Sequence, residues 1–241
     1  MDIRTNKSRL GNFTSSEIAA LMSEGKAKDS IGKPFYTYVK EKQRERRLGR
    51  SLNNDSSARP LTWGKLVEMK GFELLGTEYG LYSDKTIIHP DCPFWSGSPD
   101  GIIHEEEKVV FDLKCPYTLN SFCELAECKN IDEVRANHKD GEKYYFQLVS
   151  NAILTGCNWG ELIVYCPYKS ELESIKEMAN NWDGDDQKKY AWIWFADDEE
   201  LPYLIDGEYY PHLVKIRFPI PQSDKEALTE RVKLAGELLC S

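Results

Sequence analysis

Residues 109–114 read Val-Val-Phe-Asp-Leu-Lys, an apolar run that is typical of a buried β-strand. Because strand side chains alternate between two faces, Asp112 and Lys114 share one face and their apolar neighbours share the other. Asp100 precedes Asp112 by twelve residues and lies in the turn Ser98-Pro99-Asp100-Gly101. The stretch therefore predicts a β-hairpin on which two carboxylates can hold a divalent cation beside a lysine.

The elements on either side of this hairpin follow from apolar periodicity and from Pro, Gly and capping signals. Thr14-Ser15-Ser16-Glu17 has the pattern of a capping box that opens a first helix. Further helices are expected near residues 34–48, 61–75, 121–128, 144–155 and 223–239, and strands near residues 85–89, 94–97, 101–104, 162–166 and 191–195. The expected core stripe of the helix 61–75 includes Met69. This order indicates an α/β or α+β fold with a central mixed β-sheet flanked by helices.

Length and composition fit one soluble domain that spans residues 1–241. No apolar run approaches the roughly 20 residues that cross a bilayer, and the N-terminus lacks a signal-peptide pattern, so we expect a cytoplasmic protein. Seven cysteines, an odd number at irregular spacings, indicate reduced thiols rather than disulfides or a zinc site.

The formal net charge of −9 looks unfavourable for a protein that handles DNA, but the acidity is regional. Residues 171–208 hold 12 acidic residues against 3 lysines, and the rest of the chain then carries 28 acidic and 28 basic residues. The remainder can therefore display a basic groove. The overall charge does argue against indiscriminate electrostatic coating of DNA.

Further motifs surround the hairpin in a fixed order. Trp63-Gly64-Lys65-Leu66-Val67-Glu68 places a carboxylate on the helix before it, and Tyr144-Tyr145-Phe146-Gln147 places a glutamine on the helix after it. Arg9-Leu10-Gly11 and the Thr14–Glu17 motif lie upstream. Together these motifs resemble the phage lambda exonuclease family, the YqaJ-like viral recombinases within the PD-(D/E)XK nuclease superfamily.

The resemblance covers roughly residues 9–168 and implies a restriction-endonuclease-like core. The segment 171–208 would then be an acidic insertion, and 223–239 a C-terminal helix. The family likeness also implies a metal-dependent phosphodiester hydrolase. Mg²⁺, with Mn²⁺ as an alternative, takes oxygen ligands, often from one or two carboxylates together with water and phosphate.

Within such a site, Asp100 and Asp112 would be direct ligands and the Leu113 backbone carbonyl a third. Glu68 would complete the site, directly or through water, and could support a second ion. A bound metal would acidify its water and neutralise charge on the phosphate, while Lys114 would orient or deprotonate the attacking water. Without these flanking motifs, Asp112 and Lys114 would be read as a structural ion pair.

The resemblance further implies a pocket for the 5′-phosphate of DNA, which maps onto Arg9, Ser16, Ser98 and Gln147. Arg9 can offer a bidentate fork to phosphate, and the first turn of a capped helix favours an anion near Ser16. Each residue also has a structural alternative: a surface arginine, a capping serine, a turn serine and a packing glutamine. Leu61 lies where the family has a strand-separating wedge, and is equally credible as a core leucine.

The implied activity is 5′-to-3′ digestion of linear double-stranded DNA to mononucleotides, which leaves a 3′ overhang for phage-type recombination. A homotrimer and a single-strand annealing partner are expected on the same ground, in a bacterial or phage-infected host cell. An endonuclease or repair nuclease with the same core is the main alternative. A non-catalytic DNA-end-binding scaffold is a second, and a carbohydrate hydrolase a third that leaves Lys114 unexplained.

Overall fold

The computed structural model describes residues 9–27, 30–52, 58–82, 86–183 and 187–240. In chain order the elements are β1 (Phe13–Thr14), η2 (Ser15–Met22), α1 (Lys33–Leu48), α2 (Arg59–Glu73), β2 (Tyr79–Leu81), β3 (Ile87–Ile88), β4 (Trp95–Gly97), β5 (Gly101–Ile103) and β6 (Val109–Lys114). They continue with α3 (Leu119–Ala126), α4 (Ile131–Asn137), α5 (Gly141–Thr155), β7 (Trp159–Tyr165), η3 (Lys169–Glu171), α6 (Leu172–Asn180), α7 (Gln187–Phe195), η4 (Asp198–Glu200), β8 (Leu213–Pro219) and α8 (Gln222–Cys240).

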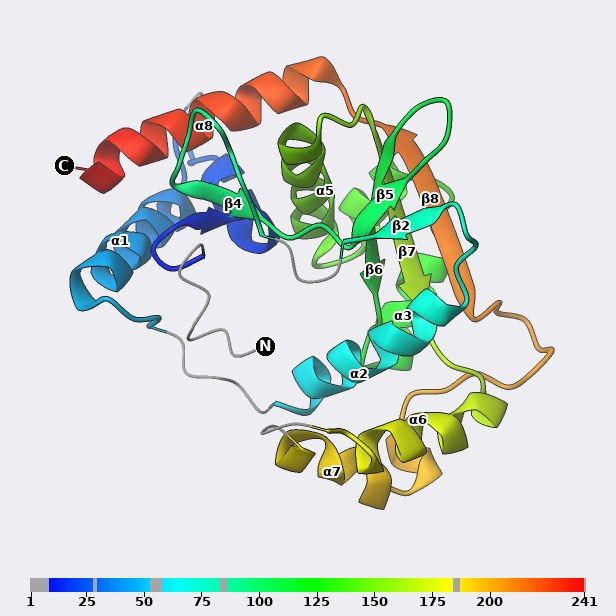
Figure 1. Ribbon diagram of the computed structural model, residues 1–241. Helices are drawn as coiled ribbons and strands as arrows, with labels where there is room; N and C mark the ends of the chain where they lie inside the picture. Colours follow the sequence, from blue (N-terminus) through cyan, green and yellow to red (C-terminus); the bar gives the residue numbers. More distant parts are fainter. Residues whose placement is uncertain (1–8, 28–29, 53–57, 83–85, 184–186, 241) are drawn as a thin grey trace.

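The strands form two sheets flanked by helices, as the sequence predicts (Figure 1). The larger sheet has the strand order β2-β5-β6-β7-β8, and the smaller sheet has the order β1-β4-β3. In the larger sheet β6 and β7 run parallel, whereas the other neighbouring strands run antiparallel. The connection from β6 to β7 contains α3, α4 and α5, which provides the crossover that two parallel strands require.

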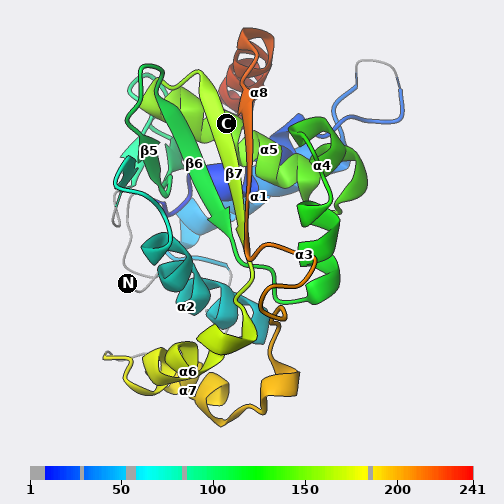
Figure 2. The ribbon, with the colours of Figure 1, turned by 90° about the vertical axis from the view of Figure 1, so that its right-hand side faces the viewer.

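The central strand β6 separates two apolar cores, one on each face of the larger sheet (Figure 2). Val109, Phe111 and Leu113 pack with α2, α6 and α7, whereas Val110 packs on the opposite face with α5. These four side chains are at most 2% exposed, and each contributes roughly 1.5–3 kcal/mol of burial free energy. A one-residue shift in register would move Asp112 toward the wrong core, so burial fixes the face on which Asp112 lies.

Helix α5 covers the Asp112 face of the sheet. Most of its length is buried, from Tyr145 to Ala152, and it packs against η2, α8 and both parallel strands. Gly156, with a φ of +71°, ends the helix in the left-handed conformation that glycine adopts most readily. The predicted helix 144–155 is therefore confirmed, with one additional turn at its start.

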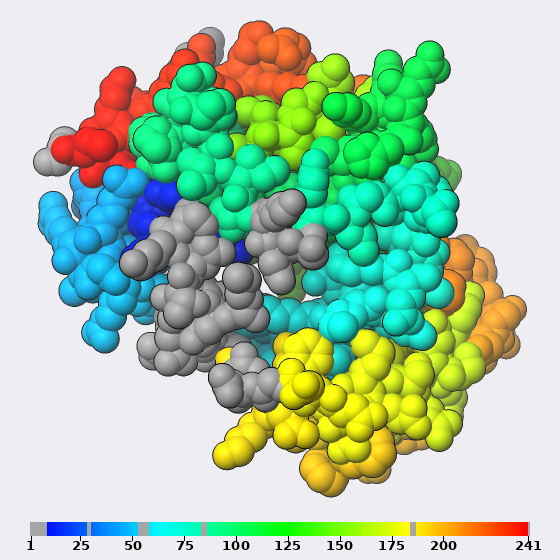
Figure 3. All heavy atoms as spheres, in the orientation of Figure 1, coloured from blue at the N-terminus to red at the C-terminus, as the bar shows by residue number. Residues whose placement is uncertain are grey.

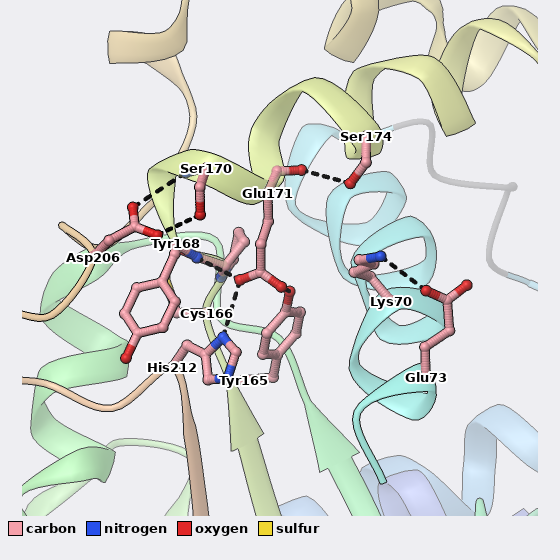
Figure 4. A network of polar contacts seen from close by, with 11 residues as sticks. Lys70, Glu73, Tyr165, Cys166, Tyr168, Ser170, Glu171, Ser174, Asp206 and His212 are labelled. Carbon is pink, nitrogen blue, oxygen red and sulfur yellow. Dashed lines mark hydrogen bonds and ion pairs between the residues drawn. The ribbon is translucent and has the colours of Figure 1, made fainter.

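The acidic segment 171–208 forms α6 and α7, which pack against α2 at the lower end of the molecule (Figure 3). Glu171 anchors its start rather than facing solvent. Its carboxylate accepts hydrogen bonds from the Tyr165 hydroxyl (3.0 Å) and the Tyr168 amide (2.7 Å), and lies 3.0 Å from His212 Nδ1 (Figure 4). A polar network thus joins the acidic segment to the end of β7 and to the start of β8.

Two secondary-structure expectations are wrong. Residues 191–195 lie in helix α7, not in a strand, because Tyr190 and Ile193 are the buried positions and have helical spacing. The Thr14 side chain does not cap the first helix, and Glu17 pairs with Lys143 at 3.0 Å instead of reaching back. Thr14 belongs to β1, and the following eight residues form a 3₁₀ helix.

Smaller differences concern edges and single side chains. The sequence patterns missed the short strands β1 and β2, the edge strand β8, and helix α4. Met69 is 44% exposed and does not belong to the core stripe of α2, which is formed by residues such as Leu66 and Val67. Lys85, the first residue of the expected strand 85–89, lies outside the described residues. All seven cysteines are free thiols, as expected.

Alanine substitutions at two glycines, one in the hairpin and one in α2, should change the stability of the protein in opposite directions. A Cβ at Gly101 would lie 2.2 Å from the Gly80 carbonyl oxygen, so Gly101→Ala is expected to lower the free energy of unfolding by about 1–3 kcal/mol. A Cβ added at Gly64, inside α2, would have the Cys115 carbonyl oxygen as its nearest neighbour, at an ordinary 3.8 Å. Gly64→Ala is therefore expected to raise that free energy by roughly 0.5–1 kcal/mol. Urea titration of both variants measures the two shifts; a stable Gly101→Ala protein would contradict the close strand approach.

Candidate active site

The β5–β6 hairpin brings Asp100 and Asp112 side by side. Gly101 pairs with Phe111 in antiparallel register, so Asp100, one residue earlier, lies opposite Asp112. The Leu113 amide donates a hydrogen bond of 2.6 Å to Asp100 Oδ2, which fixes that carboxylate against β6. The predicted hairpin and the proximity of its two carboxylates are therefore present in the structure.

Asp112 is held by two partners on its own side of the sheet. Lys114 Nζ lies 2.5 Å from Asp112 Oδ2, and Gln147 Nε2 donates a hydrogen bond of 2.6 Å to Asp112 Oδ1. Lys114 also donates to Gln147 Oε1 at 3.3 Å and lies 5.5 Å from the centre of the Tyr144 ring. Strand β6 and helix α5 thus share one polar cluster at the end of the parallel strand pair.

Glu68 adds a third carboxylate from α2. Leu66 and Val67 pack the apolar side of α2 against β6 and its neighbours. Glu68, the next residue, therefore lies near the end of β6. The charges of Lys114 and Asp112 act on Glu68, and Glu68 in turn acts on Asp100. Three carboxylates and one ammonium group therefore share a partly buried region.

Burial and the nearby negative charge make Asp100 and Glu68 reluctant to ionise. Burial raises the pKa of Asp100 well above its usual range, and the charges of Asp112 and Glu68 raise it further. Burial also raises the pKa of Glu68 to about 7, although Lys114 opposes this shift. The pKa of Lys114 is raised because Asp112 and Asp100 outweigh the effect of its burial, so Lys114 is an ammonium at neutral pH.

This donor set fits a hard divalent cation. Asp112 Oδ2 is buried, and apart from the Lys114 ammonium at 2.5 Å it has no hydrogen-bond partner among the residues that the structure describes. A bound cation would relieve the repulsion that raises the pKa values of Asp100 and Glu68. Among the residues that the structure describes, no three Asp, Glu, His or Cys side chains are arranged so that they could hold a metal ion by themselves, so water and phosphate would have to supply further ligands. The arrangement therefore suits Mg²⁺, which keeps several waters and shares its coordination with phosphate.

Three of the four residues expected to bind the 5′-phosphate come from elements that meet beside this cluster. The parallel pairing of Thr14 with Ser96 directs Ser16 and Ser98 to the same end of β1 and β4. The smaller sheet and η2 pack on α5, which carries Gln147. Ser16 Oγ lies 3.3 Å from Thr14 Oγ1, and Ser98 Oγ lies 3.1 Å from Thr86 Oγ1.

Two expected DNA contacts remain: Arg9, the fourth residue of the phosphate pocket, and Leu61, the expected wedge. Arg9 lies in the turn before β1, where its backbone carbonyl accepts from the Asn12 amide. Its side chain makes no hydrogen bond or ion pair with any residue that the structure describes. Leu61, in the first turn of α2, is 43% exposed, so the interpretation as a core leucine is wrong. Its role as a wedge stays a prediction.

Comparison of the sequence with known protein families agrees with this description of the site. The model of the YqaJ-like viral recombinase domain matches residues 6–158, which is more than half of the chain. The chain belongs to the YqaJ-like viral recombinase family. The match includes Glu68, Asp100, Asp112, Lys114 and Gln147, and it confirms the resemblance read from the motifs.

Solved structures show the same fold at low sequence identity. An alkaline exonuclease from Laribacter hongkongensis is 18% identical, with a TM-score of 0.58 over 96% of this chain and 89% of the other. Its complex with dAMP gives the same TM-score and coverage at 17% identity. A phage-related exonuclease from Haemophilus somnus 129PT is 13% identical, with a TM-score of 0.63 over 95% of this chain and 93% of the other. No curated protein matches the sequence.

The raised pKa of Glu68 makes stability depend on pH. Glu68 ionises near pH 4.5 in the unfolded chain but near pH 7 in the folded protein, so folding is weakened as the pH rises through this interval. The loss is up to about 3 kcal/mol by pH 8. A bound divalent cation should offset it, so we expect Mn²⁺ to raise the melting temperature more at pH 8 than at pH 5.

Differential scanning fluorimetry of the wild type and Glu68→Gln tests this expectation. The variant lacks the titrating carboxylate, so its metal-free melting temperature should fall less between pH 5 and pH 8. Equal Mn²⁺ shifts at both pH values, or identical pH profiles for the two proteins, would remove Glu68 from the cluster.

Proposed function

We propose that this chain is a metal-dependent nuclease that hydrolyses phosphodiester bonds at the ends of double-stranded DNA. The observation that carries the proposal is the cluster of Asp100, Asp112 and Lys114 on the β5–β6 hairpin, with Glu68 nearby. Burial and the charge of Asp112 raise the proton affinity of Asp100 and Glu68, and the raised pKa of Glu68 weakens folding as the pH rises. A hydrolytic site that recruits a cation gives this arrangement a physical reason.

The protein groups have distinct roles in this proposal. Asp100 and Asp112 would hold Mg²⁺ or Mn²⁺, with the Leu113 carbonyl and Glu68 as further ligands for one or two ions. When bound, the metal would acidify a coordinated water and neutralise charge on the scissile phosphate. The Lys114 ammonium, held by Asp112 and Gln147, would orient the attacking water and donate to the phosphate oxygens as their charge grows.

The direction and the products of digestion are the finer part of the proposal. We infer 5′-to-3′ digestion of linear duplex DNA to mononucleotides, which leaves a 3′ overhang. Membership of a viral recombinase family and the fold shared with two exonucleases support this inference. A homotrimer and a single-strand annealing partner belong to the same proposal. No helix in the described part of the chain is long and apolar enough to span a membrane.

Linear and covalently closed duplex DNA of the same sequence separate an exonuclease from an endonuclease. With Mg²⁺, we expect the purified protein to release acid-soluble nucleotides from linear DNA and to leave the closed circle intact. Selective protection of duplexes with phosphorothioate links at both 5′ ends would support the 5′-to-3′ direction. Cleavage of the closed circle would favour an endonuclease, and binding of ends without nucleotide release would favour a scaffold.

A further inference from the structure

Gln147 is the residue through which α5 contacts both functional groups of β6. Its side chain is 8% exposed, and its two amide atoms have different partners. Nε2 donates to Asp112 Oδ1 at 2.6 Å, and Oε1 accepts from Lys114 Nζ at 3.3 Å. With the 2.5 Å contact between Lys114 and Asp112, the three side chains close a triangle.

The chemistry of this triangle requires an amide. An ionised carboxylate only accepts hydrogen bonds, and an ammonium only donates them. A bridge between Asp112 and Lys114 therefore needs one donor and one acceptor on a short planar group, which glutamine provides. A carboxylate at this position would repel Asp112, and an apolar side chain would leave Oδ1 of Asp112 buried without its donor.

The amide also decides which oxygen of Asp112 is left for another ligand. Oδ1 is occupied by Gln147, whereas Oδ2 is buried and faces only the Lys114 ammonium, 2.5 Å away, among the polar groups of the described residues. The backbone of Gln147 is held as well, because the next two residues of α5, Leu148 and Val149, are fully buried. Helix α5 thus holds the carboxylate plane from a rigid support.

We propose that Gln147 is a positioning residue that sets the orientation of Asp112 and Lys114, rather than a ligand of the DNA 5′-phosphate. This inference rests on the proposed nuclease function for its kinetic part. It departs from the phosphate-pocket role that the family resemblance implies for Gln147. In the structure both amide atoms are already engaged by the hairpin, so a phosphate would have to displace an existing contact.

The two roles differ in how a variant treats the chemistry of the DNA end. We would measure turnover of linear duplexes that carry either a 5′-phosphate or a 5′-hydroxyl, for the wild type, Gln147→Leu and Gln147→Glu. Mn²⁺ affinity, measured by isothermal titration calorimetry without DNA, provides a second readout that needs no activity. Asn151→Leu is a matched control, because Asn151 is a fully buried amide one turn along α5 whose side chain hydrogen-bonds to neither Asp112 nor Lys114.

For a positioning residue, both Gln147 variants should lose about 10–100-fold in turnover on both substrates, with an unchanged ratio between 5′-phosphate and 5′-hydroxyl. The Mn²⁺ affinity of Gln147→Leu, which changes no charge, should weaken about tenfold or more. Asn151→Leu should match the wild type in both measurements. Thermal melting identifies any variant that is unfolded, and Gln147→Glu keeps the shape of the side chain if Gln147→Leu does not fold.

A loss confined to 5′-phosphorylated ends, with unchanged Mn²⁺ affinity, would make Gln147 a phosphate ligand and overturn the proposal. Wild-type behaviour of both variants would also overturn it. If the wild-type protein digests no DNA, the proposed function fails, but the Mn²⁺ titration still tests the positioning role. In that case unchanged Mn²⁺ affinity of Gln147→Leu overturns the inference.

Discussion

Asp112→Asn is expected to reduce Mg²⁺-dependent digestion of linear duplex DNA by at least about 10³-fold. Asparagine keeps the shape of the side chain, but it removes the negative charge that pairs with Lys114 at 2.5 Å and that would face the metal. Stabilisation of transition-state charge by a metal amounts to several kcal/mol, and each 1.36 kcal/mol changes the rate tenfold. Release of acid-soluble nucleotides measures the loss directly.

Glu161→Gln is a suitable control for Asp112→Asn. Glu161 is an equally buried carboxylate on the neighbouring strand β7, where it accepts hydrogen bonds from Tyr79 and Arg217 at 2.7 Å. It makes no contact with the hairpin carboxylates, so the change should leave digestion near the wild-type level. Equal activity of Asp112→Asn and the wild type, with both proteins folded, would exclude Asp112 from the site.

Lys114→Met should separate catalysis from metal binding. Methionine replaces the ammonium with an unbranched apolar side chain, so the group that would orient water and donate to phosphate is lost. We expect turnover to fall by about 10²–10⁴-fold. Mn²⁺ should bind at least as tightly as it does to the wild type, because the cation that competes for Asp112 Oδ2 is absent.

Turnover under saturating Mn²⁺, together with calorimetric titration, measures both effects in one set of proteins. Asp112→Asn should lose activity and Mn²⁺ binding together, whereas Lys114→Met should lose only activity. A Lys114→Met protein that digests DNA normally would reduce the Asp112–Lys114 contact to a structural ion pair. A parallel loss of Mn²⁺ affinity in Lys114→Met would indicate that Lys114 supports the fold of the hairpin instead.

The hairpin could be predicted from sequence because its determinants are local. The alternation of residues 109–114 assigns Asp112 and Lys114 to one face, and the turn at Asp100 lies within hairpin distance of them. Burial of both faces, by α5 on one side and by α2, α6 and α7 on the other, then fixes the register. The fold class follows for the same reason, since long periodic helices such as α1, α5 and α8 have clear signals.

The remaining features depend on packing between distant segments. The aromatic run 190–195 favours a strand by composition, but contact with α2 and α6 makes it a helix. The edge strand β8 pairs with β7 over seven residues, and the sequence does carry a signal for it that went unrecognised. Val214, Ile216 and Phe218 alternate with Lys215 and Arg217, which is the period of a half-buried strand. Gln147 could be placed near the site from its motif, but its hydrogen bonds to Asp112 and Lys114 required coordinates.

A crystal structure of the wild-type protein with Mn²⁺, solved with anomalous diffraction data, tests the metal site most directly. We expect an anomalous peak in contact with carboxylate oxygens of both Asp100 and Asp112, on the side of the cluster that Glu68 and Lys114 border, and no such peak in Asp112→Asn. A Mn²⁺ ion bound elsewhere, or an empty hairpin in crystals that hold Mn²⁺ at other sites, would contradict the assignment of this cluster as the catalytic centre.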